Sequence, residues 1–183
     1  MTEQEEDAMK IAIIGHSGSG KSTLARKLSE KYDLPVLHFD AVQFRPNWEI
    51  RPQPSKEIMT KVFLDLHSDW VIDGNYSKLS YERRMEEADV IVVMLFNRLN
   101  CLWRVTKRYV TYKNKTRPDM GPGCKEKLDW EFVKWILRDG RSKTAKDRYS
   151  WVISRYGDKV IVIKNQRQLN AVESHIERIL MKE

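Results

Sequence analysis

Short unbroken runs of apolar residues alternate along this chain with segments in which apolar residues recur at helical spacing. Runs of the first kind are typical of strands that are covered on both faces of a parallel sheet. A helical pattern separates each run from the next, so the sequence predicts a doubly wound α/β domain. We expect the most hydrophobic run, 90–96, to be the central strand. The five expected strands are 10–14, 35–39, 70–72, 90–96 and 159–163.

Helical patterns fill most of the intervals between these strands. We expect Ser55 to cap a helix whose apolar face consists of Ile58, Val62 and Leu66. The stretch 114–124 is rich in Pro and Gly and lacks apolar periodicity, so we expect a mobile, unpacked loop there. The other expected helices are 21–31, 78–87, 98–113, 125–138 and 142–155, followed by a closing amphipathic helix marked by Leu169, Val172, Ile176, Ile179 and Leu180.

The junction between the first strand and the first helix carries the phosphate-binding loop pattern G-x-x-x-x-G-K-[ST]. Its Gly and Ser residues allow backbone N–H groups to turn toward a polyphosphate, at a helix N-terminus that favours anions. Lys21 supplies a cation for the β- and γ-phosphates, and the Ser22 hydroxyl is placed to ligate Mg²⁺. Strand, motif and helix follow in the expected order, so we predict that the chain binds a nucleoside triphosphate. The motif consists of Gly15, His16, Ser17, Gly18, Ser19, Gly20, Lys21 and Ser22.

Length and composition limit the remaining possibilities. The chain has 183 residues, enough for one domain with a substantial core, and no apolar run long enough to cross a membrane. Residues 1–8 are acidic, and we expect them to form a disordered tail before a single domain at 9–183. Cys101 and Cys124 have no metal-ligand spacing, so we expect reduced thiols in a cytoplasmic protein.

The net charge of +7 is concentrated in one part of the chain. Residues 98–151 contain 15 Lys or Arg residues and 6 Asp or Glu residues, which gives that segment a net charge of +9. Such a basic cluster suits a lid that closes over phosphates, and it also suits a surface that binds nucleic acid. Its position downstream of a phosphate loop favours a helical lid, which we place at about 98–151.

Two aspartates follow expected strands and are candidates for catalysis. Asp73 ends a strand beside Gly74, where its carboxylate suits Mg²⁺ binding opposite Ser22. Asp40 ends another strand, where it suits accepting a proton from a substrate hydroxyl or orienting the acceptor. A turn or helix-capping role is the alternative for both. The carboxyl ends of the strands share one rim of a doubly wound sheet, so we expect these groups to meet there.

Basic and aromatic residues elsewhere complete the candidate site. Arg138, Arg141 and Arg148 have spacings that suit guanidinium groups directed from the lid toward a transferring phosphoryl group. We expect at least one of them to enter the site, and a solvated helix face is the alternative for each. The loop 44–51 suits stacking on a planar ring and holding an anion, or forms a hydrophobic plug with solvated arginines. We expect His38 to be packed rather than catalytic.

Several segments together resemble the bacterial DNA topology modulation (FlaR-related) proteins. The resemblance covers nearly all of the chain from Met9 onward, and its later segments are more specific than the phosphate loop. Proteins of this family are similar to adenylate kinases and other small-molecule kinases of the P-loop class. The segments that carry the resemblance are 15–22, 36–40, 71–76, 101–104, 115–120, 129–132 and 164–167.

The resemblance implies a three-layer α/β P-loop fold with sheet order 2-3-1-4-5, an acceptor-binding helical segment after the second strand and an arginine-bearing lid after the fourth. Thr23, which follows the motif, joins the candidate nucleotide-binding residues together with Arg104 and Arg167, which lie in two of the matching segments. Adenylate kinases have Asp-Gly-Phe-Pro-Arg where this chain has Asp-Gly-Asn-Tyr-Ser at 73–77. The arginine that would hold an acceptor monophosphate is therefore missing at that position.

We predict an enzyme that uses Mg²⁺ and transfers the γ-phosphoryl group of ATP to a small acceptor, such as a nucleotide or a nucleoside. Lys21, Asp40, Asp73 and a lid arginine would carry the catalysis, and Ser22 with Asp73 would bind the metal. The alternative is a nucleotide-gated regulator that contacts DNA through the basic surface of 98–151, although no base-reading motif occurs in the sequence. The identity of the acceptor and the oligomeric state stay open at this point.

Overall fold

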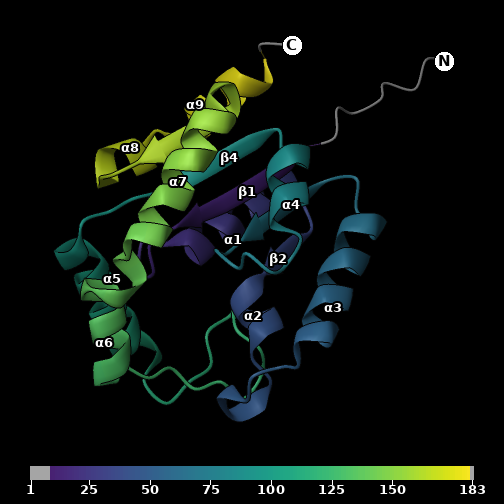
Figure 1. Cartoon of the computed structure of the whole chain (residues 1–183). Helices are drawn as coiled ribbons and strands as arrows, with labels where there is room; N and C mark the ends of the chain where they lie inside the picture. The colour runs from purple at the N-terminus through teal and green to yellow at the C-terminus, as the bar shows by residue number, and fades with distance from the viewer. Residues whose placement is uncertain (1–8, 182–183) are drawn as a thin grey trace.

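The computed structural model describes residues 9–181, so the expected acidic tail at 1–8 lies outside the described residues. Five strands form one sheet that is flanked by helices (Figure 1). The strands are β1 (Lys10–Gly15), β2 (Val36–His38), β3 (Trp70–Asp73), β4 (Val90–Met94) and β5 (Val160–Ile163). The α-helices are α1 (Lys21–Tyr32), α2 (Phe39–Gln43), α3 (Gln53–Leu66), α4 (Tyr81–Glu87), α5 (Arg98–Tyr112), α6 (Trp130–Leu137), α7 (Lys143–Arg155), α8 (Gln166–Asn170) and α9 (Val172–Leu180), and short 3₁₀ turns are η1 (Pro46–Trp48), η2 (Asp139–Arg141) and η3 (Gly157–Lys159).

The strand order is β2-β3-β1-β4-β5 and every pair of neighbours is parallel, which confirms the predicted fold class and order. β1 lies in the middle, so the prediction that 90–96 form the central strand is wrong. β4 is still an interior strand whose residues are all buried, which accounts for its apolar sequence. Ile13 pairs with Asp73 on one side and with Val92 on the other, so the carboxyl ends of three strands share one rim.

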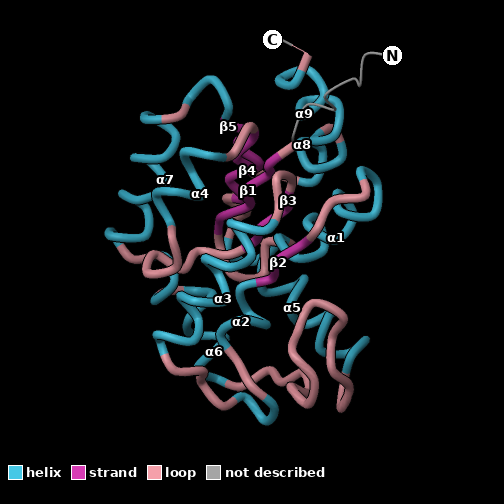
Figure 2. The backbone as a smooth tube through the Cα atoms, turned by 90° about the vertical axis from the view of Figure 1, so that its right-hand side faces the viewer, coloured by secondary structure: helices cyan, strands magenta, loops and turns pink. Residues whose placement is uncertain are grey.

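Alternate residues of the strands enter two separate cores, one on each face of the sheet. Ile11 and Ile13 of β1 belong to the core that also contains residues of α1, α5 and α9. Ala12 and Ile14 belong to the core shared with residues of α2, α3, α4 and α7. Figure 2 shows α4 and α7 on one side of the strands and α1 and α9 on the other. Because successive side chains of a strand point to opposite faces, continuous apolar strands require this three-layer arrangement.

Helix α3 buries a different face from the one that its sequence predicts. Ile58, Val62 and Leu66 are largely exposed, whereas Lys56, Thr60 and Leu64 are buried. The buried polar groups have partners, since Lys56 Nζ donates to the Gln43 side chain and the Thr60 hydroxyl donates to the Lys56 carbonyl. These hydrogen bonds make a polar face compatible with burial, because a satisfied polar group loses little on leaving water.

The bounds of α3 and of two other helices also differ from the prediction. α3 begins at Gln53, so Ser55 lies inside the helix rather than at its cap. The helix expected at 125–138 begins at Trp130, where the Asp129 side chain accepts from the N–H of Phe132. The closing helix is divided at Ala171 into α8 and α9.

Within residues 9–181 none of the helices combines the length and the apolar character needed to cross a membrane.

Candidate active site

The phosphate loop connects β1 to α1 and lines a cavity of about 1480 Å³ at the carboxyl ends of the strands. Gly15, Gly18 and Gly20 have φ values of 138°, 77° and 98°, which L side chains rarely adopt. At Gly18 space is also lacking, because a Cβ atom there would lie 2.7 Å from Cγ2 of Val105 and 2.8 Å from the carbonyl oxygen of Cys101. The glycines therefore set both the curvature of the loop and the close approach of α5.

Hydrogen bonds fix the loop to the neighbouring strand ends. The side-chain amide of Asn75 accepts from the N–H of Gly15 at 2.9 Å and donates to the Gly15 carbonyl at 2.5 Å. The N–H of His16 donates to the carbonyl of Met94 at 2.9 Å. Asn75 was not among the candidate site residues, and the structure assigns it to the support of the loop.

Lys21 is the cation of the loop, and a backbone carbonyl holds its ammonium. Its Nζ donates to the carbonyl of His16 at 3.1 Å. Burial lowers the pKa of Lys21, and the negative charges of Asp40 and Asp73 partly offset that effect. The carbonyl contact positions the ammonium inside the loop, where it is oriented toward a phosphate group that enters the cavity.

Asp73 lies at the centre of a short hydrogen-bonded row. Ser22 Oγ donates to Asp73 Oδ2 at 2.7 Å, and Nδ1 of His38 lies 2.5 Å from Asp73 Oδ1. Burial favours the neutral imidazole, but the hydrogen bond and the charge of Asp73 outweigh it and raise the pKa of His38. His38 is packed, as expected, and its imidazole also contacts the candidate metal ligand.

The donor atoms of Ser22 and Asp73 fit Mg²⁺. This ion prefers oxygen ligands and usually takes one or two from the protein, with water and phosphate oxygens completing its shell. A hydroxyl and a carboxylate that lie 2.7 Å apart beside the phosphate loop provide two such oxygens. The predicted meeting of these two residues is therefore present in the structure.

The prediction that Asp40 ends a strand is wrong. β2 stops at His38, and Asp40 lies in the first turn of α2, where a carboxylate is favoured by the helix dipole. Asp40 Oδ1 accepts from the hydroxyl of Tyr76 at 2.9 Å, and Oδ2 lies 3.9 Å from Arg117. The carboxylate still faces the cavity, and 45% of its side chain is exposed.

A buried ionic cluster, which sequence reasoning missed, forms the wall beside Asp40. We call Arg108, Arg117, Asp119 and Glu126 the Arg117 cluster. Arg117, 6% exposed, lies 2.9 Å from Asp119 and 2.8 Å from Glu126, and Arg108 lies 2.8 Å from Glu126. The stretch 114–124 is thus packed, with Met120 and Cys124 also buried, and the expectation of an unpacked loop is wrong. Charge pairing replaces the missing apolar periodicity.

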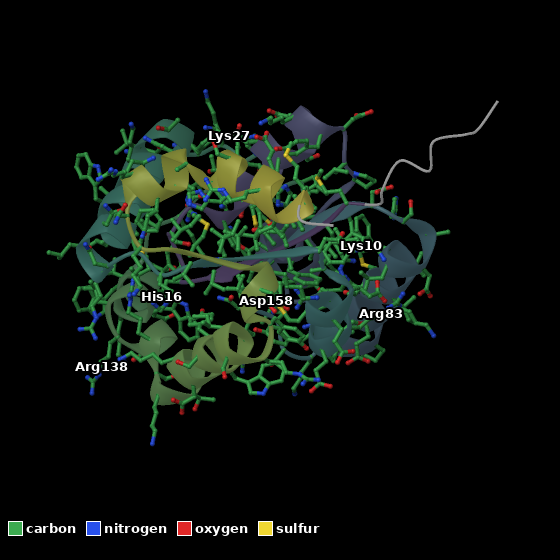
Figure 3. The ribbon with its side chains drawn as sticks, turned by 90° about the horizontal axis from the view of Figure 1, so that it is seen from above. Lys10, His16, Lys27, Arg83, Arg138 and Asp158 are labelled. Atoms are coloured by element: carbon green, nitrogen blue, oxygen red, sulfur yellow. The ribbon has the colours of Figure 1, made fainter. Side chains whose placement is uncertain are left out.

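The three candidate lid arginines have different surroundings. Arg148 lines the cavity and donates to the carbonyl of Asn75 at 3.4 Å. Arg141 does not line it, because its guanidinium donates to the carbonyls of Ile136 and Phe96 at 3.0 and 2.9 Å. Arg138 is exposed, and Figure 3 shows it at the edge of the molecule while His16 lies in the interior. Of the three, the structure brings only Arg148 to the cavity.

Arg104 is the best placed of the remaining candidate nucleotide contacts. Its NH1 atom donates to the carbonyl of Ser19 at 3.0 Å, and its NH2 atom donates to Gln166 at 2.7 Å. The guanidinium also lies 4.2 Å from the ring centre of Phe96, so it forms a planar surface beside the loop. Thr23 lines the cavity from α1, whereas Arg167 is exposed and lies outside the cavity wall.

A buried arginine supports the segment that follows Asp73. Arg84 is fully buried, and its guanidinium donates to the carbonyls of Leu79, Gly74 and Tyr76 at 3.0, 3.4 and 3.1 Å. It also lies 4.3 Å from the ring centre of Phe39. These contacts tie α4 to the turn that carries Tyr76, and so hold the partner of Asp40 in place.

The fold is similar to that of solved structures, whereas no protein-family model and no curated protein matches the chain. A shikimate kinase from Acinetobacter baumannii, solved in complex with shikimate, has a TM-score of 0.59 and 16% identity, covering 97% of this chain and 96% of that chain. An uncharacterized protein from Eubacterium ventriosum has a TM-score of 0.55 and 18% identity, with 93% and 98% covered. These likenesses, together with the strand order, show a P-loop fold of the adenylate-kinase type.

Proposed function

We propose that this protein is a kinase that transfers the γ-phosphoryl group of ATP to a hydroxyl group of a small molecule. The observation that carries the proposal is the hydrogen bond between Ser22 and Asp73 beside the partly buried Lys21 of the phosphate loop, in the wall of the main cavity. The likeness to a structure described as a shikimate kinase supports the same reaction class. The sequence resemblance to DNA topology modulation proteins is compatible with the same fold, but it does not indicate which compound accepts the phosphoryl group.

The roles of the residues follow from their positions. Lys21 and the backbone N–H groups of the loop bind the phosphates, and Arg148 approaches the same end from α7. Asp40 accepts the proton of the acceptor hydroxyl, whose oxygen forms a bond to the γ-phosphorus while the bond from that phosphorus to the β-bridging oxygen breaks. Mg²⁺, held by Ser22 and Asp73, would neutralise charge on the phosphate oxygens. The products are ADP and the phosphorylated acceptor.

Two substitutions at the phosphate end test this proposal. Lys21→Ala removes the cation of the loop, so ATP binding should be abolished or greatly weakened. Asp73→Asn keeps the shape of the side chain but removes its charge, so turnover should fall by about 100-fold or more while ATP affinity changes only a few-fold. Phosphorylation of a panel of nucleosides, nucleotides and sugars, measured with labelled ATP, gives the turnover. Unaltered ATP affinity and turnover in both folded variants would contradict the proposal.

A regulator that binds DNA is the second candidate, and one observation favours it. A smaller cavity of about 750 Å³ lies at the start of α5, and Arg98, Arg141 and Lys146 line it together with Trp103. No Asp or Glu is among its lining residues in the described part of the chain. Cations with an aromatic ring suit a nucleic-acid backbone and a stacked base.

Retention on DNA at increasing salt, with and without ATP, separates the two candidates. Phosphate contacts weaken steeply with salt, so a kinase with a basic surface should lose DNA at moderate salt whether or not ATP is present. Retention that persists at about 0.2 M salt and changes with ATP would favour the regulator.

A further inference from the structure

The charges that line the main cavity are divided unevenly between its two ends. At the phosphate end, Lys21, Arg104 and Arg148 donate to carbonyl oxygens or amide side chains. Across residues 9–181, none of these three cations lies within 4.0 Å of a carboxylate oxygen. Their positive charge is therefore available to a polyphosphate.

The opposite end of the cavity has the reverse balance. Both of its sheltered cations, Arg108 and Arg117, are already paired with Glu126, and Arg117 is also paired with Asp119. Asp40 adds a third carboxylate that is only loosely paired, at 3.9 Å from Arg117. Two guanidinium groups thus face three carboxylates, so these groups have no net positive charge to offer a ligand. Lys21, on whose ammonium the charge of Asp40 acts, is directed to the phosphate end.

Exposed lysines do not reverse this balance. Lys127 lies 3.4 Å from Asp129, and its ammonium lies 5.2 Å from the ring centre of Trp48. Lys78 and Lys107 also line the cavity, but the side chains of both are exposed. Water and salt screen charges at such positions, so they contribute little to the binding of an anion.

An aromatic wall completes this end. Phe44 and Trp48 both line the cavity, and their rings meet edge to face with centres 5.1 Å apart. The indole N–H of Trp48 donates to the carbonyl of Lys125 at 2.9 Å, so the loop that carries it is attached to the segment of the Arg117 cluster. An aromatic wall of this kind suits a planar ring in the ligand.

We propose that the acceptor is an uncharged compound with a hydroxyl group and a planar ring, of the chemical class of a nucleoside, and that acceptors with a phosphate or carboxylate group are excluded. This inference rests on the proposed kinase function for the transfer step. The selection of acceptors by charge depends only on the residues that line the cavity and not on catalysis. An anionic group placed there faces the carboxylate of Asp40, whose ion pair with Arg117 is long at 3.9 Å, and the arginines that would attract it are held by Asp119 and Glu126. The cavity would thus exclude anionic acceptors through unfavourable contacts with carboxylates, rather than select the neutral acceptor through additional favourable ones.

Matched pairs of acceptors test the inference in the native protein. Each nucleoside is compared with its 5′-monophosphate, and a neutral cyclic polyol is compared with shikimate, at saturating ATP and Mg²⁺. We expect kcat/KM for the uncharged member to exceed that for the anionic member by at least about 10-fold. Equal or better use of the anionic members would overturn the inference while leaving the kinase function intact.

A charge substitution tests the same inference without catalysis. Asp119→Asn releases part of the Arg117 guanidinium, so the variant should bind inorganic phosphate at this end while a non-hydrolysable ATP analogue with Mg²⁺ occupies the phosphate loop. Asp147→Asn removes an equal charge from an exposed position on α7 and serves as the control. The native protein and this control should show no second phosphate site in calorimetry.

Stoichiometric binding of phosphate by the native protein under these conditions would disprove charge selection. If Asp119→Asn is too unstable to purify, the native titration still decides the question. A panel in which no acceptor is phosphorylated contradicts the kinase function, and the phosphate titration then decides the charge selection separately.

Discussion

His16, the second residue of the phosphate loop, is buried beside several cations. Burial lowers the pKa of its imidazole to about 4, and the charges of Arg141 and Lys21 act in the same direction. Its ring meets that of Tyr149 edge to face, with centres 5.4 Å apart. At neutral pH the side chain is therefore an uncharged part of the packing under the loop, in contrast to His38, whose pKa is raised.

This difference predicts how the stability of the protein depends on pH. In the unfolded chain His16 takes up a proton near its ordinary pKa of 6.5, whereas in the folded protein it does so only near 4. The unfolded state thus binds more protons in this window, and stability should fall as pH drops from 6.5 to 4. With about 1.4 kcal/mol for each pKa unit, His16 contributes at most roughly 3 to 4 kcal/mol to this loss.

Urea unfolding followed by tryptophan fluorescence between pH 4 and 7 measures the effect. His16→Gln cannot be protonated, so the free energy of unfolding should lose part of its pH dependence in this variant. His175→Gln, at an exposed position on α9, is the control and should retain the native slope. Identical slopes in all three proteins would mean that folded His16 accepts a proton readily.

The candidate site residues that the structure brings together as expected are those whose assignment depends on near neighbours in the chain. Lys21 and Ser22 follow from a continuous motif, and Asp73 follows from its place after an apolar strand. Arg117 and Arg84 have no such signal, because neither belongs to a motif and a single arginine in a sequence resembles any solvated cation, even when its partners lie within about ten positions of it. Arg141 was a candidate on the same kind of pattern, and the structure places its guanidinium against the carbonyls of Ile136 and Phe96 rather than in the cavity wall.

At the scale of elements, helix α5 is part of the core as well as the first helix of the expected lid. Cys101 and Val105 are buried against the sheet and approach Gly18 more closely than a side chain would allow. The spacing of apolar residues predicts a helix at this place. It does not predict which helix touches the phosphate loop, because that contact depends on how the sheet is ordered.

Substitution of Gly18 measures this contact. Gly18→Ala places a methyl group against α5 and strains a residue with φ of 77°, so we expect a loss of about 1 to 3 kcal/mol in stability and weaker ATP binding. Gly157→Ala is a matched control, because a Cβ atom there meets nothing within 4 Å. Chemical unfolding and nucleotide titration of both variants provide the measurements. Equal effects of the two substitutions would show that the approach of α5 is not restrictive.

The predictions from the sequence were wrong for the elements that bury polar side chains. Periodicity assigns the core face of a helix to its apolar residues, yet α3 buries Lys56 and Thr60 because their hydrogen bonds are complete. The stretch 114–124 lacks apolar periodicity and is nevertheless packed, because Arg117 replaces apolar contacts with ion pairs. Both errors have one cause, which is that apolar periodicity does not register polar side chains that are buried with satisfied hydrogen bonds or ion pairs.

At the scale of the whole molecule, the strand order was correct, whereas the expected lid at 98–151 divides into parts that are held to different degrees. α5 is anchored in the core, and the Arg117 cluster anchors the segment that follows it. α6 is held less firmly, since Ile136 is buried while Trp130 and Trp135 are largely exposed. The indole N–H of Trp135 donates to the Ser17 hydroxyl at 3.0 Å, so α6 reaches across the phosphate loop.

We therefore expect nucleotide binding to act on α6 and η2 and to leave the rest of the lid nearly unchanged. A triphosphate at the loop adds negative charge next to the basic segment 98–151 and should order Ser17, the partner of Trp135. Local opening of α6 should therefore become less frequent. Hydrogen exchange measured with and without ATP and Mg²⁺ should slow within 130–141, whereas exchange in β1, β4 and α5 should change little.

Two tryptophan variants make this test specific. Trp135→Phe removes the donor to Ser17, so ATP should protect α6 less in this variant than in the native protein. Trp151→Phe alters a partly exposed ring of α7 outside the cavity wall and should leave the protection unchanged. Equal exchange of 130–141 with and without nucleotide in the native protein would mean that α6 is a rigid part of the fold. The basic charge of the segment would then need another partner, and the DNA-binding alternative would gain support.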